Sequence, residues 1–260
     1  MLLTTILALT LSAPAQAPAP AKPADPQEQK ADAKEPPTPQ HTGIRALFGD
    51  LGEDLRHLPA MQNVYIAAIG GGLAAAVHPA DQTFNVRLQN SGATVDAVFA
   101  PGKYLGDTPA QIALSLGTYI VGRWRDQPKV AHLGMDLLQA QILTEMMVEP
   151  IKFSTNRLRP DGSNHQSFPS GHAAITFAAA TVIERHLGWR KAALGYVIAS
   201  YVAASRLHDN RHYVSDVVFG AAVGTIAGRT VVHHRSDYWA LTPAAVPGGG
   251  VMLMVTRRNF

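Results

Sequence analysis

The chain has 260 residues, of which 47% are hydrophobic and 16% are charged, so it can bury a large apolar core or contact a membrane. The formal net charge of +3 is small and not gathered into basic runs, which argues against nucleic acid as a partner. The absence of cysteine excludes disulfides, thiolate metal sites and cysteine nucleophiles.

Residues 1–17 have the pattern of a secretory signal peptide, with a short apolar run before the small residues Ala15 and Ala17. An uncleaved N-terminal anchor is the alternative. Residues 18–41 are rich in Pro, Ala and charged residues and contain no large apolar residue, which predicts a flexible tether. The predicted location is therefore outside the cytoplasm, in the periplasm or the cell envelope.

Apolar periodicity in the rest of the chain predicts an all-α fold, a helical bundle, with a short strand or tail near the C terminus. We expect a helical domain over 42–240 and a tail or edge strand over 241–260. Residues 81–107 read as a loop with short helical pieces, and Thr108 as the N-cap of the next helix. Expected helices are 44–58, 62–78, 108–121, 130–148 (ended at Glu149-Pro150), 170–186, 189–204 and 212–233, and 251–256 is the expected strand.

Polar residues gather in three motifs between the later helices. They supply three fixed cations, two imidazoles, a carboxylate and a Ser-Gly turn, a set that suits a tetrahedral oxyanion attacked by a histidine. The candidate residues are Lys152, Arg159, Ser170, Gly171, His172, Arg206, His212 and Asp216.

Spacing places this chemistry on the predicted helices. Ser170 precedes a helix, so the backbone N–H groups of Gly171 and His172 can face an anion. His212 and Asp216 are four residues apart at the start of the last helix, hence on one face. Asp216 then holds one ring nitrogen of His212 as a donor and leaves the other free to attack phosphorus.

The order K-x6-R-P, P-S-G-H and S-R-x5-H-x3-D resembles the signature of the type 2 phosphatidic acid phosphatase superfamily, which includes class A acid phosphatases and vanadium haloperoxidases. The resemblance covers about residues 130–233. It implies a metal-independent hydrolase of phosphomonoesters, either small organic phosphates or lipid phosphates, that needs no cofactor.

Roles follow from the same resemblance. His212 is implied to be the nucleophile that forms a phosphohistidine, with Asp216 orienting it. His172 is implied to protonate the leaving group. The remaining five candidates, Lys152, Arg159, Ser170, Gly171 and Arg206, are implied to hold the phosphoryl oxygens.

Other readings stay open. The pocket could hold vanadate in a haloperoxidase, pass phosphate to an acceptor other than water, or bind anions without catalysis. His208, His212 and Asp216 could form a metal-binding face, although adjacent arginines oppose this. Arg157 reads as a rim charge, and the helix-end histidines His186, His233 and His234 read as structural.

The relation to the membrane is also open. The stretches Asp216–Arg229 and Lys191–Arg206 contain about twelve to fifteen residues between charges, where spanning needs about twenty. With a mean hydropathy of +0.01, this favours a soluble or peripheral domain over an integral one. Membrane-embedded lipid phosphatases are the alternative, and the oligomeric state is not predicted.

Overall fold

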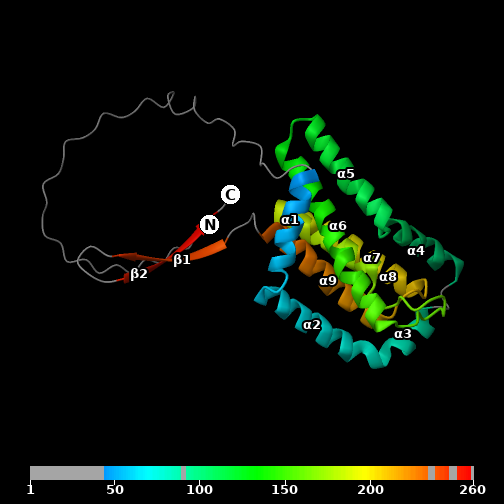
Figure 1. The fold of residues 1–260 in the computed structure, drawn as a ribbon. Helices are drawn as coiled ribbons and strands as arrows, with labels where there is room; N and C mark the ends of the chain where they lie inside the picture. Colours follow the sequence, from blue (N-terminus) through cyan, green and yellow to red (C-terminus); the bar gives the residue numbers. More distant parts are fainter. Residues whose placement is uncertain (1–43, 89–91, 234–237, 246–250, 259–260) are drawn as a thin grey trace, which may run out of the picture. The chain divides into compact units, whose positions relative to one another are not determined.

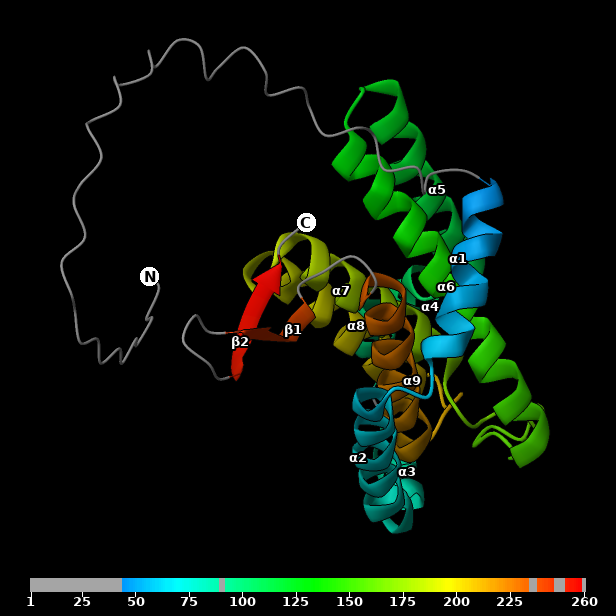
Figure 2. The same ribbon diagram turned by 60° about the vertical axis from the view of Figure 1, so that its left-hand side comes forward.

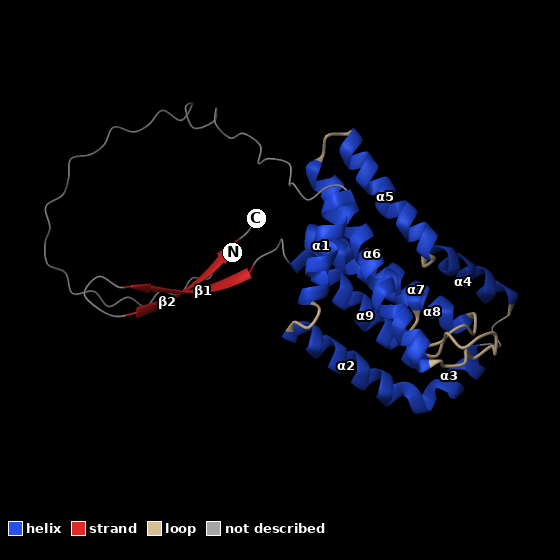
Figure 3. Ribbon diagram, viewed as in Figure 1, coloured by secondary structure: helices blue, strands red, loops and turns tan. Residues whose placement is uncertain are grey.

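The computed structural model describes residues 44–88, 92–233, 238–245 and 251–258, and it confirms the all-α class (Figures 1 and 3). The predicted signal peptide and tether, residues 1–41, lie outside the described residues. The elements are α1 (Ile44–His57), α2 (Met61–Val77), the short 3-10 helix η2 (His78–Ala80), α3 (Asp81–Leu88), α4 (Ala93–Leu105), α5 (Thr108–Trp124), α6 (Pro128–Thr155), α7 (Gly171–Leu187), α8 (Trp189–His208), α9 (Val214–His233), β1 (Tyr238–Ala245) and β2 (Val251–Arg258).

Helix α7 is the centre of the bundle, because it contacts α6, α8 and α9. Its buried face is built from small and branched residues such as Ala174, Ala178 and Val182, and α6 adds Leu143. Helix α9 can lie close against α7 because Gly224 has no side chain: a Cβ there would fall 1.9 Å from the carbonyl oxygen of Ala174. This tight core fixes the helix ends that carry the motifs.

The helices α1 to α5 cover this core. Helix α2 packs along α9, α4 along α8, and α5 along α6, while α1 contacts α6 and α9 (Figures 1 and 2). Glycines lie in each of the three long contacts: Gly70 faces Ala222, Gly102 faces Ser205, and Gly122 faces Ala131. Small residues thus let the backbones of the two layers approach closely.

The structure corrects three predicted boundaries. Pro150 does not end a helix, because α6 continues to Thr155, so Lys152 lies on a helix; packing of the long helix outweighs the one backbone bond that proline removes. Residues 81–107 are mostly helical, as α3 and α4. Helix α9 begins at Val214, so His212 precedes it instead of lying on it.

The C-terminal strand prediction is confirmed and extended. Strand β2 covers 251–258 and pairs antiparallel with β1, with Tyr238 opposite Arg258 and Ala245 opposite Val251. The hairpin begins at Tyr238, before the expected boundary at 240/241. Thr108 is the first residue of α5, and Asp107 takes the N-cap position that we expected for Thr108.

Length and composition qualify one described helix as a membrane span. This segment is Val214–Val232, of which 56% is buried inside the bundle. A bent pair, Leu47–His57 with Met61–Arg87, passes the same test only if its two helices count as one span.

Candidate active site

The three motifs meet at one end of the bundle because successive helices run in opposite directions. Lys152 lies in the last turn of α6, and the Ser170–His172 segment begins α7. Arg206 lies near the end of α8, and Asp216 lies in the first turn of α9. The structure therefore gathers the candidates that are far apart along the chain.

His212 is buried and its ring is held by two groups. Its Nδ1 lies 2.6 Å from the carbonyl oxygen of Ser167 and 3.8 Å from Oδ2 of Asp216. We expected Asp216 to make the hydrogen bond; instead the Ser167 carbonyl accepts it, and Asp216 acts through its nearby charge. The difference arises because His212 lies before α9, so the pair does not share a helix face. Nδ1 carries the proton in this arrangement, which leaves Nε2 as the nitrogen able to attack.

Asp216 has no exposed surface and is surrounded by donors. Its Oδ2 accepts hydrogen bonds from the Ser167 hydroxyl at 2.5 Å and the Tyr213 backbone N–H at 2.8 Å. Its Oδ1 accepts one from Nη1 of Arg157 at 2.5 Å. An arginine and two further donors therefore fix this buried carboxylate in position.

Arg157 is not the rim charge that the sequence predicted. Its guanidinium also donates to Oδ2 of Asp81 at 2.8 Å and lies 4.2 Å from the centre of the Tyr213 ring. Asp81, buried at the start of α3, in turn accepts hydrogen bonds from the backbone N–H and the hydroxyl of Ser215. Arg157 thus bridges Asp216 to a carboxylate of the N-terminal layer. Only the folded chain brings Asp81 to a site about 130 residues away, so no sequence motif marked it.

At the Ser170-Gly171 turn, the N-terminus of α7 lies close to the ammonium group of Lys152. A Cβ on Gly171 would lie 3.3 Å from Nζ of Lys152, so a side chain there would crowd the lysine. Lys152 is itself held by Oε1 of Glu149 at 2.7 Å. The backbone N–H of Ser170 donates to the Asp216 carbonyl at 3.0 Å, which fixes the start of α7 against α9. The helix N-terminus of α7 therefore faces the site.

His172 is half-buried, and its Nε2 atom is buried without a hydrogen-bond partner among the described residues. Burial and the charges of Arg206, His212 and Lys152 together lower the pKa of His172 to about 3, while a hydrogen bond to the backbone of Lys103 opposes them. The turn between α4 and α5 reaches the ring because Gly106 has no side chain: a Cβ there would fall 2.9 Å from Cδ2 of His172.

Burial also lowers the pKa of His212. Asp216 opposes this effect and the charge of Arg159 adds to it. The pKa of Arg159 itself is lowered by burial and by the charge of Arg211. Arg206, almost fully buried, pairs with Asp209 at 2.5 Å. Cations from three parts of the chain therefore act on the two histidines.

Two further candidate atoms are buried without a partner in the part of the chain that the structure describes. They are Nε of Arg159 and Oγ of Ser170, which join Nε2 of His172. Buried polar groups in folded proteins nearly always have a partner. Three predicted site residues therefore each have one buried polar atom that a polar ligand could satisfy.

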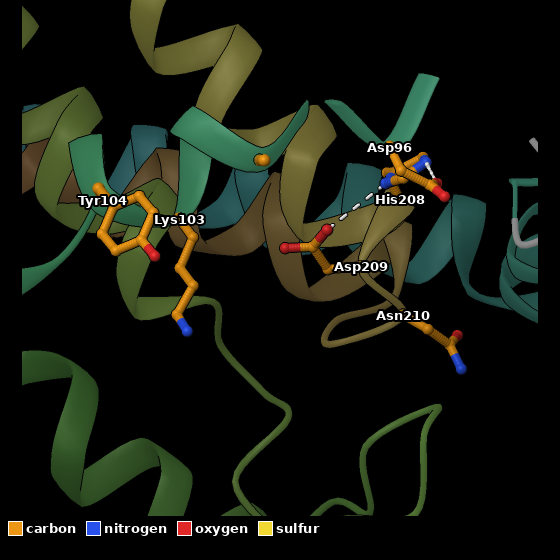
Figure 4. A pocket seen from close by; sticks show the side chains of 7 residues that line it. Asp96, Lys103, Tyr104, His208, Asp209 and Asn210 are labelled. Atoms are coloured by element: carbon orange, nitrogen blue, oxygen red, sulfur yellow. Dashed lines mark hydrogen bonds and ion pairs between the residues drawn. The ribbon is translucent and has the colours of Figure 1, made fainter. Parts of the chain in front are cut away.

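A pocket of about 430 Å³ opens beside these residues. Lys103 and Tyr104 stand on one side of it and His208 and Asn210 on the other, with Asp209 between them (Figure 4). Asp209 is the partner of Arg206, so the pocket adjoins the cationic end of the site.

The predicted alternative of a metal face on His208, His212 and Asp216 is wrong. Nε2 of His208 lies 3.1 Å from Asp96, and the ring stacks on Phe99 at 4.8 Å. His212 instead directs Nδ1 to Ser167. The two histidines therefore have different neighbours and do not converge on one ion.

Residues 133–239 match the family model of the PAP2 superfamily. This part of the chain is therefore similar to the PAP2 domain. The match contains all eight predicted site residues, from Lys152 to Asp216, whereas Asp81, Lys103 and Gly106 lie before it.

Known proteins with this domain include lipid phosphatases. A lipid A 1-phosphatase of Porphyromonas gingivalis is 47% identical over 85 residues, which are 32% of this chain and 19% of that protein. The transmembrane PAP2-type phosphatidylglycerolphosphate phosphatase of Bacillus subtilis superposes with a TM-score of 0.56 at 22% identity, over 66% of this chain and 94% of that one. LpxE of Aquifex aeolicus superposes with a TM-score of 0.50 at 24% identity, over 58% and 93%.

The two structural likenesses show that the PAP2 domain has the fold of those enzymes. The chain spans at most about half the length of the curated relatives it matches. The contacts of Asp81 and Gly106 show how helices outside the matched region complete the site around the PAP2 motifs.

Proposed function

We propose that the protein is a phosphatase that hydrolyses a phosphate monoester of a membrane lipid through a phosphohistidine on His212. The observation that carries this proposal is the set of three buried, unpartnered polar atoms described above, on Arg159, Ser170 and His172. All three suit the oxygens of a phosphoryl group, and the fixed cations Lys152 and Arg206 complete its surroundings.

In the first step, Nε2 of His212 attacks phosphorus, the N–P bond forms and the bond to the ester oxygen breaks. The Nδ1 proton remains on the bond to the Ser167 carbonyl, and Asp216 stabilises the positive charge that the ring gains. His172 gives a proton to the leaving oxygen. The lowered pKa of His172 rises when the phosphate dianion binds beside it, so that the proton is supplied with the substrate.

In the second step, water attacks phosphorus, His172 accepts its proton, and the N–P bond breaks to release inorganic phosphate. The charge that develops on the phosphoryl oxygens is stabilised by the guanidinium and ammonium groups and by the N-terminus of α7. These groups perform the task that a metal ion has in many phosphatases, and we therefore propose a metal-independent reaction.

The outer surfaces of α2, α5 and α8 favour a lipid environment. Large apolar side chains point outward on α2, α5 and α8 instead of toward the core: among them Ile69 is 63% exposed, Trp124 82% and Leu194 67%. Exposed apolar surface on this scale marks contact with a partner or with a membrane. The helical lengths of α8 and α9, 20 residues each, correspond to about 30 Å, the thickness of a bilayer core.

We therefore propose that α2, α5 and α8 face lipid, which revises our preference for a soluble or peripheral domain. The relatives named above, a lipid A 1-phosphatase and a phosphatidylglycerolphosphate phosphatase, act on membrane lipids according to their names, and this supports a lipid phosphate as the substrate. The location outside the cytoplasm remains a prediction of the sequence.

The test is phosphate release from phosphatidic acid in detergent micelles and from a soluble aryl phosphate, in excess chelator. We expect release from the lipid in the presence of chelator, and a loss of about 10³-fold or more in His212→Ala, because the nucleophile is removed. A radiolabelled phosphoryl group should remain on the unchanged protein after a rapid acid-free quench and be absent from the variant.

The matched control is His165→Ala. His165 lies in the loop before Ser167, and its Nδ1 is 3.1 Å from the Asn156 carbonyl. This variant should keep most of the activity. Full activity in His212→Ala would contradict the nucleophile, and activity that needs an added metal would contradict the metal-independent reaction. Release from the aryl phosphate alone would contradict the lipid substrate.

A further inference from the structure

A second cluster of chemically active side chains lies at the other end of α6 and α7. His132 and Asp136 are on α6 and His186 is in the last turn of α7, and one ligand atom from each lies within 4.8 Å of the others. Asp136 precedes Lys152 by 16 residues and His186 follows His172 by 14, which places the cluster about 20–25 Å from the catalytic groups along the helices. It is therefore separate from the catalytic site.

The two distances from imidazole nitrogen to carboxylate oxygen are close to those between neighbouring ligands of a small cation. Nε2 of His186 is 2.8 Å from Oδ2 of Asp136, and Nε2 of His132 is 3.6 Å from Oδ1. Four ligands around an ion with bonds of about 2.0–2.2 Å lie about 3.3 Å apart, between these two values. The two rings stand nearly perpendicular, at 82°, and both direct Nε2 toward the carboxylate.

The surroundings favour a positive charge at this position. Asp136 has no exposed surface, and its carboxylate lies between the two imidazoles of His132 and His186. The neighbouring residues Leu133, Leu137 and Val182 belong to the apolar core, which strengthens charge interactions by excluding water. The C-terminal end of α7, where His186 lies, is the negative end of the helix dipole.

The sequence spacing of the three residues also resembles that of metal ligands carried by helices. Two ligands four residues apart on one helix lie on the same face, and a third from a neighbouring helix closes the set. Two imidazoles and a carboxylate suit zinc and neighbouring transition metals better than calcium or magnesium, which prefer oxygen ligands alone.

We propose that His132, Asp136 and His186 bind one divalent transition metal ion, Zn²⁺ by preference, which ties α6 to α7 at this end of the bundle. The site leaves one tetrahedral position for water. The ion stabilises the bundle and takes no part in phosphate transfer. This gives His186 a role beyond the structural one that its position at a helix end predicted.

The test is Zn²⁺ binding by the full chain, purified in detergent without a histidine tag, stripped with chelator and titrated against a chromophoric competitor. We expect one tight site per chain. The variants His132→Gln and His186→Gln should each weaken binding by more than the roughly 10–100-fold that loss of an outer-shell partner costs. Cobalt in place of zinc should give the visible absorption of a tetrahedral site, and the variants should lose it.

The matched control is His57→Gln, which removes an exposed histidine on α1 and should bind Zn²⁺ like the unchanged protein. Asp136→Asn, which keeps the shape of the side chain, separates a lost ligand from a lost fold, because Zn²⁺ should raise the Tm of the unchanged protein and leave that of the variant unaltered. Equal Zn²⁺ affinity in the unchanged protein and in both glutamine variants would overturn the proposal, as would the absence of a tight site in the unchanged protein.

Discussion

Helices α2 and α7 bury opposite kinds of side chain. The buried residues of α2 are Asn63, Gly70 and Ala74, while its large apolar residues, such as Ile69 and Leu73, face outward. The buried face of α7 is apolar over most of its length. The hydrophobic effect therefore holds α7 in place, whereas α2 depends on close backbone contact and on polar bonds such as the one from Asn63 to Thr230 at 2.9 Å.

This difference agrees with the proposal that the two layers of the protein have different surroundings. The apolar side chains of α6, α7 and α9 are buried inside the bundle, whereas many of those on the covering helices are exposed on its surface. The two layers are joined at the end of the bundle that holds the three motifs by Arg157, which binds Asp81 of the covering layer and Asp216 of the central layer. Substitutions at this junction and in each layer test whether the two layers are held in place by different interactions.

The largest effect should come from breaking the junction. Arg157→Gln leaves two buried carboxylates, those of Asp81 and Asp216, without their cation, and removing one partner of a buried ion pair costs about 3–5 kcal/mol. We also expect kcat to fall by about 10–100-fold because Asp216 is no longer held beside His212. Unfolding in detergent and steady-state kinetics measure the two effects.

The control is Arg211→Gln, which removes a half-exposed ion pair with Asp161 at 3.0 Å and should cost about 0–1 kcal/mol. Arg157→Lys, which keeps a charge, should recover part of the activity. If Arg157→Gln and Arg211→Gln behaved alike, the two layers would not depend on this junction.

Glycines in the two layers should respond in opposite directions to the same change. Gly224→Ala places a Cβ against the carbonyl of Ala174 in the tight contact between α7 and α9, which should destabilise the protein by about 1–3 kcal/mol. Gly72→Ala on α2 meets no atom within 4 Å and should stabilise it by about 0.5–1 kcal/mol through its helix propensity. The Tm of each variant, measured by thermal unfolding, tests both signs. A lower Tm in Gly72→Ala would show that α2 is packed on its outer side as well.

A further expected effect is a dependence of stability on pH. The pKa of His172 is about 3 in the folded protein and 6.5 in the unfolded chain, so the unfolded state binds more protons between these values. The contribution to stability is therefore complete above pH 6.5 and is lost as the pH falls from 6.5 toward 3. Between pH 7.5 and 5.0, His172 should account for about 1–2 kcal/mol of the loss.

His172→Gln should remove this part of the pH dependence, as measured by unfolding at the two pH values, and the exposed His57→Gln should leave it unchanged. A profile identical in all three proteins would mean that folding does not shift the pKa of His172.

Much of the site was predictable because its residues occur as local motifs. The order of Lys152, the Ser170-Gly171-His172 turn and Arg206 indicated the family and the chemistry, and helix polarity then implied that the ends of α6 to α9 meet. Apolar periodicity likewise predicted most helices, because a helix that buries one face has apolar residues spaced three and four apart. The family match and the all-α fold confirm the resemblance and the fold class, while the roles of the site residues stay predictions.

Other features arise only from tertiary contacts. Helix α6 runs through Pro150 because its packing outweighs a local signal, and the ring of His212 is held by the Ser167 carbonyl, an atom that every residue possesses. Asp81, Arg157 and the cluster around Asp136 pair charges across long sequence separations, which no local pattern records. The sequence alone predicted which groups would carry the proposed chemistry. Only the tertiary structure decided which groups hold them, because a buried charge pairs with a residue of the element that packs against it.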